Sequence, residues 1–275
     1  MAPLTSYLSS ALNGAKRAVT RADEVLQRSL ATVGIRQAEA TIAADSQRYW
    51  RQPRDGRWKA NSHWRDSEAF EDADLWDRIG AEHLAMLEAD ARLVGSTRPW
   101  NRVVEWGCGG GANAVHFAPR CEEFIGVDIS ADTLDECRRQ VKTACDTPFR
   151  AVEIAVDEPE TALREIDAEC DVFLCFYVFE LIPTPAYGER LLRIARELLA
   201  PGGLALVQIK YDTGRWRTRP RHRSYRSGLA EMTTYPIDSF WVLATKCGLT
   251  PHAVRLVPRN ELDKRYAYFF MTNEG

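Results

Sequence analysis

Several features that would place this 275-residue chain in a special class are missing from it. Its seven cysteines are an odd number and form no C-x-x-C pair, so neither a disulfide framework nor a zinc site is indicated. We expect reduced, mostly buried thiols and no metal. No apolar run approaches the roughly 18 residues of a membrane span. The 36 basic and 39 acidic residues nearly balance, which argues against binding of nucleic acid over the whole surface.

The amino-terminal part has helical periodicity but no secretory signal. Residues 1–25 lack a continuous apolar segment with a cleavage site after it, so we expect a cytoplasmic protein. Apolar residues recur at helical spacing up to about residue 48, with basic side chains between them. This pattern is typical of a packing or dimerisation arm and predicts a homodimer through these helices. A peripheral membrane helix is the alternative.

Two further segments complete an expected helical cap over residues 1–98. Residues 49–70 hold three tryptophans, a proline and a glycine, which indicates a structured loop because tryptophan is costly to expose. Residues 72–94 have the pattern of one amphipathic helix whose start is rich in aspartate. We interpret that aspartate cluster as a helix start and not as a metal site.

From residue 99 to residue 275 the sequence alternates between apolar strands and amphipathic helices. Five strands are expected at 102–106, 123–129, 149–156, 171–178 and 204–210, with helices at 111–119, from Ser130 onward, at 159–167 and at 185–200. Strands that are apolar nearly throughout and separated by helices predict a parallel sheet covered on both faces. Helix 236–247 and two strands at 253–258 and 265–272 then predict an antiparallel hairpin at the sheet edge.

The first strand leads into a glycine-rich turn, VVEWGCGGGANAVHF, at 103–117. Gly107, Gly109 and Gly111 let the chain turn tightly into a helix and let a ligand approach the backbone, where helix N–H groups point at it. No Gly-Lys-Ser/Thr follows, which excludes a P-loop. Ala112 stands where the dinucleotide motif has its third glycine, so the turn by itself leaves a dinucleotide site open.

Two carboxylates follow at strand ends. Asp128 ends the second strand, 23 residues after Glu105, where it can accept hydrogen bonds from both ribose hydroxyls. Asp157 ends the third strand, within reach of an adenine amino group. Together with FELI after the fourth strand and LAPGG before the fifth, these features resemble the class I S-adenosylmethionine (SAM)-dependent methyltransferases over roughly residues 100–272. The resemblance implies an α/β, Rossmann-like, mostly parallel sheet of seven strands, with SAM as cofactor and S-adenosylhomocysteine as product.

The resemblance also implies roles for individual residues. The cofactor-binding set comprises Glu105 at the amino group, Gly107, Cys108 and Gly109 along the methionine part, Gly111 in the same turn, Asp128 at the ribose, Ile129 and Asp157 at adenine, and backbone atoms near Phe176 at the methionine amine. One departure follows strand four, where the family often has Glu-His and this chain has Glu180-Leu181. Glu180 is therefore either a site residue or a solvated carboxylate in the first turn of a helix.

A hydroxyl acceptor benefits from a general base, and the sequence offers four candidates. These are His63 in the tryptophan-rich loop, His83 in the next helix, and Tyr177 and Glu180 just past strand four. His63 is favoured because a core does not need such a polar, tryptophan-rich loop; a structural histidine is the alternative. Nearby, Trp64 is expected to stack on a sugar or ring, and Arg65 is expected to clamp the cofactor carboxylate.

A basic insertion at 211–235 follows strand five. It carries Tyr211, Arg215 and Trp216, which with Trp64 and His83 form the expected acceptor-binding set. Its interleaved arginines and aromatics leave three interpretations open: a solvated loop, a site for an anionic small molecule, or a site for RNA or DNA.

We therefore expect a SAM-dependent methyltransferase that acts on a small molecule, by O-methylation of a hydroxyl on a sugar, a glycolipid precursor or another secondary metabolite. Neither a stable complex with nucleic acid nor a membrane span is expected. A tRNA or rRNA methyltransferase that holds RNA on the basic insertion is the alternative. A SAM-binding regulator or inactive partner is a third hypothesis.

Overall fold

The computed structural model describes residues 22–275 except 23, 24, 28, 32, 52–55, 71, 72 and 226–228. Most of the amino-terminal helix expected from the sequence therefore lies outside the described residues. Within them, no helix is long and apolar enough to cross a lipid bilayer. All seven cysteines carry free thiols, and most of them are buried.

One mixed sheet of seven strands organises the chain, in the order β3-β2-β1-β4-β5-β7-β6. The strands are β1 (Arg102–Trp106), β2 (Glu123–Asp128), β3 (Phe149–Glu153), β4 (Cys170–Cys175), β5 (Leu199–Lys210), β6 (Thr250–Arg259) and β7 (Lys264–Thr272). Strands β1 to β5 pair in parallel, and β7 lies antiparallel between β5 and β6. The parallel sheet and its antiparallel hairpin are confirmed. The strand order reverses between β1 and β4, and ligands bind at that point in such sheets.

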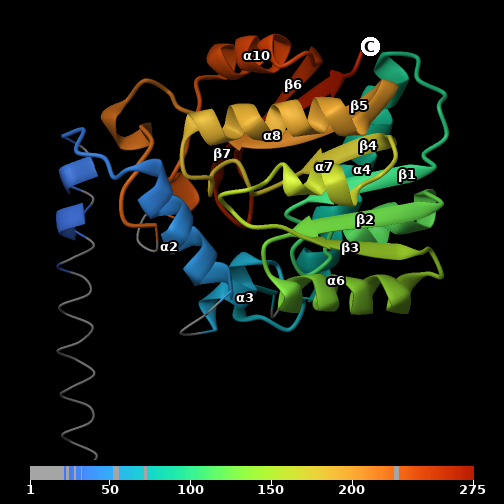
Figure 1. Ribbon diagram of the computed structural model, residues 1–275, viewed down its shortest axis with the longest axis horizontal. Helices are drawn as coiled ribbons and strands as arrows, with labels where there is room; N and C mark the ends of the chain where they lie inside the picture. The colour runs from blue at the N-terminus through green and yellow to red at the C-terminus, as the bar shows by residue number, and fades with distance from the viewer. Residues whose placement is uncertain are drawn as a thin grey trace, which may run out of the picture.

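Helices cover both faces of the sheet (Figure 1). On one face lie α7 (Thr161–Glu165), α8 (Pro185–Leu198) and α10 (Ile237–Lys246); on the other lie α4 (Ala73–Leu93), α5 (Ala114–Phe117), the short η2 (Ala118–Arg120) and α6 (Ala131–Ala144). Side chains of one strand alternate between the two cores, so that Val104 packs with the first set of helices and Val103 with the second. Both faces are buried, which explains why the strands are apolar nearly throughout.

The chain before β1 contains less continuous helix than its periodicity predicts. Helix α2 (Glu39–Arg51) begins only after a turn at Gly34, whose φ is 84°, so the expectation of one helix through residue 48 is wrong at this turn. The tryptophan-rich segment, expected as a loop, contains α3 (Arg57–Asn61) and the short η1 (Glu68–Phe70).

The cap is held to the rest of the molecule by aromatic packing. Trp50 of α2 and Trp58 of α3 are buried in a small core of their own, which also contains Tyr225 and Met232 of the insertion. Burial of large aromatic side chains is a strong stabilising contribution in such a small core. Two segments far apart in the sequence, the cap and the insertion, therefore pack as one unit.

Several element boundaries differ from the expected ones at the sheet ends. Strand β5 begins at Leu199, so the APGG segment expected to separate helix from strand lies inside the strand. Strands β3 and β4 end at Glu153 and Cys175, earlier than expected. The residues that follow them leave the sheet and turn toward its carboxyl edge, where they line a cavity.

Candidate functional site

The turn after β1 owes its shape to its glycines. Gly107, Gly109 and Gly111 have φ values of 70°, 54° and 93°, a region that is readily accessible only to glycine. A Cβ atom on Gly109 would lie 2.6 Å from the carbonyl oxygen of Ser62, so the turn also packs directly against the cap. Gly107, Cys108 and Gly109 line the main cavity, whereas Gly111 shapes the turn without lining it.

Asp128 ends β2 and holds its carboxylate against the glycine turn. Its Oδ2 accepts from the N–H of Gly109 at 3.3 Å, and its Oδ1 accepts from the N–H of Ser130 at 3.0 Å. Burial nevertheless raises the pKa of Asp128 to about 6. Ser130 caps α6 as predicted, since its hydroxyl accepts from the N–H of Thr133 at 3.4 Å. A carboxylate has about four acceptor positions, so Asp128 can still accept from a ligand.

The main cavity has a volume of about 870 Å³, its open mouth included, and lies at the carboxyl ends of β1, β2 and β4. The residues after β2 and β3 contribute an apolar wall of Ile129, Ile154 and Val156. Trp50 and Tyr225 close the cavity from outside the sheet, where the indole Nε1 of Trp50 donates to the Tyr225 hydroxyl at 2.8 Å.

Glu105 lies beneath the glycine turn, at the end of β1, and is 1% exposed. Asn113 donates from Nδ2 to its Oε1 at 2.7 Å, whereas its Oε2 has no hydrogen-bond partner in the described part of the chain. Burial raises the pKa of Glu105 to about 8. Leaving a buried carboxyl oxygen unpaired is costly, so this position suits a ligand group or a water that carries donors.

His63 and Tyr177 are in contact in the wall of the main cavity, with ring centroids 4.7 Å apart. Both have positive φ values, 54° and 56°, a strained conformation that occurs often in functional sites. The N–H of Tyr177 donates to Oε1 of Gln208, which fixes the turn out of β4. Burial lowers the pKa of His63 to about 4 and raises that of the Tyr177 phenol, so at pH 7 the imidazole is neutral and the phenol is protonated.

Asp157 and Arg65, predicted at the two ends of the cofactor, do not line the cavity. Asp157 is exposed beyond the end of β3, and the neighbouring Val156 lines the cavity instead. Arg65 is also exposed, and its guanidinium carbon lies 5.0 Å from the centroid of the Trp76 ring. The adenine end is therefore apolar, and Arg65 does not reach the glycine turn.

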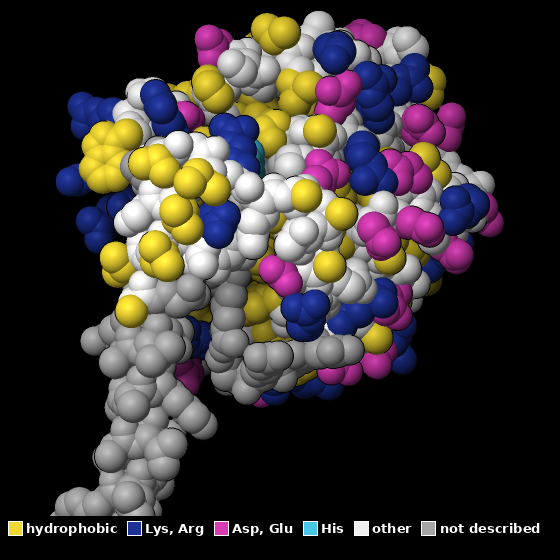
Figure 2. Space-filling view, turned by 60° about the vertical axis from the view of Figure 1, so that its left-hand side comes forward, with side chains coloured by type: hydrophobic (Ala, Val, Ile, Leu, Met, Phe, Trp, Pro, Cys, Tyr) yellow, Lys and Arg dark blue, Asp and Glu magenta, His cyan; other side chains and the backbone are white. Residues whose placement is uncertain are grey.

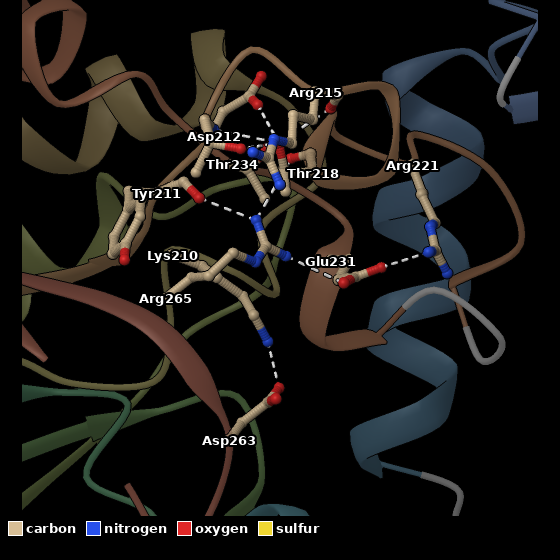
Figure 3. Close-up of polar contacts among 11 residues, drawn as sticks. Lys210, Tyr211, Asp212, Arg215, Thr218, Arg221, Glu231, Thr234, Asp263 and Arg265 are labelled. Atoms are coloured by element: carbon tan, nitrogen blue, oxygen red, sulfur yellow. Dashed lines mark hydrogen bonds and ion pairs between the residues drawn. The ribbon is translucent and has the colours of Figure 1, made fainter. Parts of the chain in front are cut away.

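Glu180 is not the solvated carboxylate of the alternative interpretation, because it is 5% exposed. Burial raises its pKa to about 7, against the opposing effect of nearby Lys210, and its Oε2 has no partner among the residues described. Lys210 is itself buried and pairs with Asp263 (Figure 3). Glu180 lies behind the cavity wall and does not line it, so the structure does not bring it together with His63.

His83 is buried on α4 beneath the main cavity. Its Nδ1 lies 2.7 Å from Oδ1 of Asn113, its Nε2 lies 3.1 Å from the Tyr268 hydroxyl, and its ring stacks on Phe176 at 4.0 Å. It lines a second, smaller cavity between α4 and the link from β6 to β7, which shares Tyr177 with the main cavity. Phe176 lines the main cavity, as predicted for a cofactor contact, and His83 does not.

The basic insertion is anchored to the sheet and is not a solvated loop throughout (Figure 3). Arg265, at the start of β7, donates to the carbonyl oxygens of Tyr211 at 2.8 Å and Thr218 at 3.4 Å, and to Glu231 at 3.0 Å. Glu231 also pairs with Arg221 at 2.6 Å. The short helices η3 (Trp216–Thr218) and η4 (Leu229–Glu231) lie within this anchored segment.

The four remaining residues of the expected acceptor-binding set lie outside the main cavity. Trp64 packs against Trp58, with ring centroids 5.1 Å apart, whereas Tyr211, Arg215 and Trp216 lie on the insertion. The insertion reaches the cavity through Tyr225 instead. Tyr225 and Asn113 are two of the site residues that the sequence reasoning missed. Asn113 lay inside the quoted glycine motif, but its contact with Glu105 is visible only in three dimensions.

The comparisons with known proteins agree with this geometry. Residues 104–205 match the family model of methyltransferase domains. No protein of curated function matches the sequence of the chain. The N-methyltransferase NodS from Bradyrhizobium japonicum, in complex with S-adenosyl-L-homocysteine, is 15% identical; its match covers 80% of this chain and 100% of its own, with a TM-score of 0.57.

A second solved structure gives the same result. Magnesium protoporphyrin IX methyltransferase ChlM from Synechocystis, with bound SAM, is 13% identical; the match covers 84% of this chain and 97% of its own, with a TM-score of 0.59. At such low identity these likenesses show the fold. The match shows a methyltransferase domain at residues 104–205, and the Rossmann-like sheet and the glycine turn with Asp128 at its crevice agree with the SAM-dependent methyltransferase fold.

Proposed function

We propose that the chain transfers the methyl group of SAM to a hydroxyl of a small molecule, namely a sugar, a glycolipid precursor or another secondary metabolite. The observation that carries this proposal is His63. Its imidazole is neutral, lies in the cavity wall, and makes no ring hydrogen bond to another residue that the structure describes. It can therefore accept a proton from an acceptor hydroxyl.

We assign the cofactor to the main cavity because its residues fit the parts of SAM. Asp128 lines the cavity and has acceptor positions for the ribose hydroxyls. Glu105 does not line the cavity but lies beneath the glycine turn, where its unpaired Oε2 suits a water below the amino group. Ile129 and Val156 offer an apolar surface for the adenine ring.

The reaction depends more on the relative positions of the acceptor oxygen and the methyl group than on acid–base catalysis. When bound, SAM supplies an electrophilic methyl group on a positively charged sulfur. The chain's own residues must hold the acceptor oxygen in line with that group and exclude water. As the oxygen–carbon bond forms and the carbon–sulfur bond breaks, His63 takes the hydroxyl proton. Tyr177, in contact with His63, limits the orientations of the imidazole.

Two predictions about the acceptor, an anionic small molecule and RNA, depend on the arginines of the insertion. An anionic acceptor would depend on arginines of the insertion, and Arg215, Arg217 and Arg219 are exposed without lining the cavity. RNA as the acceptor depends on the same arginines. A homodimer and a cytoplasmic location stay predictions.

Substitution of His63 tests the proposed function. In His63→Ala, kcat for transfer of labelled methyl from SAM to a panel of hydroxylated and amino acceptors should fall by about 10²–10⁴-fold, with SAM affinity nearly kept. His116→Ala is the matched control, because His116 lies on α5 outside the cavity, 3.3 Å from Asp77. Wild-type kcat should also hold down to about pH 5, since the pKa of His63 is about 4. Activity of His63→Ala within threefold of wild type, or transfer to amines alone, would contradict the proposal.

A further inference from the structure

The outer surface beside the cap carries exposed apolar side chains that the fold does not need. Val25, Leu26, Val33, Ile35 and Trp216 are between 48% and 72% exposed, and they are five of the nine large hydrophobic residues exposed in the described chain. Single exposed apolar residues are ordinary, but a group of them marks an interaction site. We call these five residues the apolar face.

The two segments that carry the apolar face are bound to each other. The N–H of Gln37 donates to the carbonyl oxygen of His222 at 2.9 Å, and the N–H of Ser224 donates to Oε1 of Gln37 at 2.7 Å. Nε of Arg223 donates to Oε1 of Gln27 at 2.5 Å. Figure 2 shows hydrophobic and basic side chains gathered together on one side of the molecule.

Three arginines beside the apolar face have no acidic partner among the residues that the structure describes. Arg36, Arg217 and Arg219 are exposed, and none of them pairs with a carboxylate among the residues that the structure describes. The acids of the insertion are already used: Glu231 pairs with two arginines, and Asp212 accepts from the N–H of Gly214 at 2.8 Å inside the loop. The described part of this side is therefore positive, on a chain whose net charge is −3.

We propose that the apolar face docks onto a lipid membrane with an anionic surface. Aliphatic side chains and a tryptophan would enter the headgroup region, while the arginines around them meet negative headgroups. Both the apolar face and the arginines beside it would contact such a surface, and charge complementarity favours anionic lipid over zwitterionic lipid.

Two other occupants fit the same residues less well. A second copy of this chain in a symmetric dimer would bring each patch against itself, so Arg217 and Arg219 of both copies would lie close together and repel. Nucleic acid would use the arginines and could stack on Trp216, but it gains nothing from four exposed aliphatic side chains.

Docking in this way would place the membrane beside the main cavity. Neighbouring parts of the chain close that cavity, because α2, which follows the first segment, contributes Trp50, and the insertion contributes Tyr225. An acceptor with a lipid tail could then enter from the membrane surface. This last step rests on the proposed function, whereas membrane binding itself does not.

Co-sedimentation of the full chain with vesicles tests the proposal. Vesicles of phosphatidylcholine mixed with phosphatidylglycerol should bind the protein, and vesicles of phosphatidylcholine alone should bind it much more weakly, with the difference shrinking as salt is added. Arg217→Gln with Arg219→Gln should weaken binding by about tenfold or more, since each basic residue near an anionic surface contributes about fivefold. Val33→Asp with Trp216→Asp should weaken it at least as much.

Matched controls come from the other exposed hydrophobic residues. Val242→Asp on α10 and Leu256→Asp on β6 change equally exposed side chains outside the apolar face and should leave vesicle binding unchanged. Equal binding to both vesicle types, no binding to either, or an equal loss in the controls would overturn the proposal. The proposal would also be overturned if substitutions in the apolar face changed dimerisation or poly(U) binding while the wild-type protein did not bind vesicles.

The experiment separates this proposal from the proposed function. His63→Ala should bind vesicles like wild type, and Val33→Asp with Trp216→Asp should still methylate an acceptor dissolved in water. If the wild-type protein transfers methyl groups but does not bind the anionic vesicles, the docking proposal fails and the proposed function stands.

Discussion

Nδ1 of His83 lies 2.7 Å from Oδ1 of Asn113, and this contact sets the direction of a buried chain of hydrogen bonds. Asn113 donates from its Nδ2 to Glu105, so its Oδ1 must accept, and His83 carries its proton on Nδ1. Nε2 of His83 then accepts from the Tyr268 hydroxyl at 3.1 Å. This series of hydrogen bonds joins β7 to the carboxyl group of Glu105 beneath the glycine turn.

His83→Phe should lower the free energy of unfolding by about 2–4 kcal/mol. A phenyl ring keeps the stack on Phe176, but it leaves Oδ1 of Asn113 without its partner and removes one hydrogen bond of the Tyr268 hydroxyl, at about 1–3 kcal/mol each. Urea unfolding measures the change. His252→Phe is the control, because His252 is only partly buried and should cost less than about 1 kcal/mol. Similar losses of unfolding free energy in both variants would show that the buried hydrogen bonds of His83 do not stabilise the fold more than those of His252.

Glu180→Gln should remove the part of the pH dependence of folding stability that Glu180 causes. The pKa of Glu180 is about 7 in the folded chain against 4.5 for a free side chain, so the folded state keeps a proton that the unfolded state releases. Stability from this group is complete below pH 4.5, falls as pH rises to about 7, and is lost above that. Glutamine does not titrate, so its advantage over wild type should grow by up to about 3 kcal/mol between these pH values. Parallel stability curves for the two proteins would contradict the assignment.

Arg265→Gln should loosen the insertion from the sheet. Arg265 is buried and holds Tyr211, Thr218 and Glu231 together, so its loss removes several hydrogen bonds at once and should cost about 1–3 kcal/mol (Figure 3). Trypsin should then cut within residues 211–235 sooner than in wild type. SAM affinity should also fall, because Tyr225 closes the cavity from the insertion. Arg217→Gln, at an exposed site, is the control, and equal cleavage rates in both variants would argue against the anchoring role.

The sheet and the cofactor turn could be predicted from the sequence because their signals are local. Strand periodicity, the capping serine Ser130 and the spacing from Glu105 to Asp128 each depend on a short stretch of chain. The glycine turn has the expected positive φ values for the same reason. Boundaries failed where tertiary contacts decide them, as at β5, which extends back to Leu199 because it pairs with β4 there.

The rest of the site could not be predicted because it is made by contacts between distant segments. Tyr225 reaches the cavity only because the insertion packs on Trp50 of α2, 175 residues earlier in the chain. Asp157, predicted at adenine, lies outside the cavity because β3 ends at Glu153, four residues before it, and the intervening chain turns Val156 inward. His63 was favoured from its surroundings alone, and its contact with Tyr177 supports that choice without testing the chemistry.

Calorimetric titration of S-adenosylhomocysteine into wild type and Asp128→Ala tests the central claim most directly. The account predicts one site per chain in wild type and an affinity weaker by about 2–4 kcal/mol in the variant, because two ribose hydroxyls lose a charged acceptor. Asp157→Ala should bind like wild type, since Asp157 lies outside the cavity. Unchanged affinity in Asp128→Ala, or a loss in Asp157→Ala in its place, would contradict the cofactor site described here.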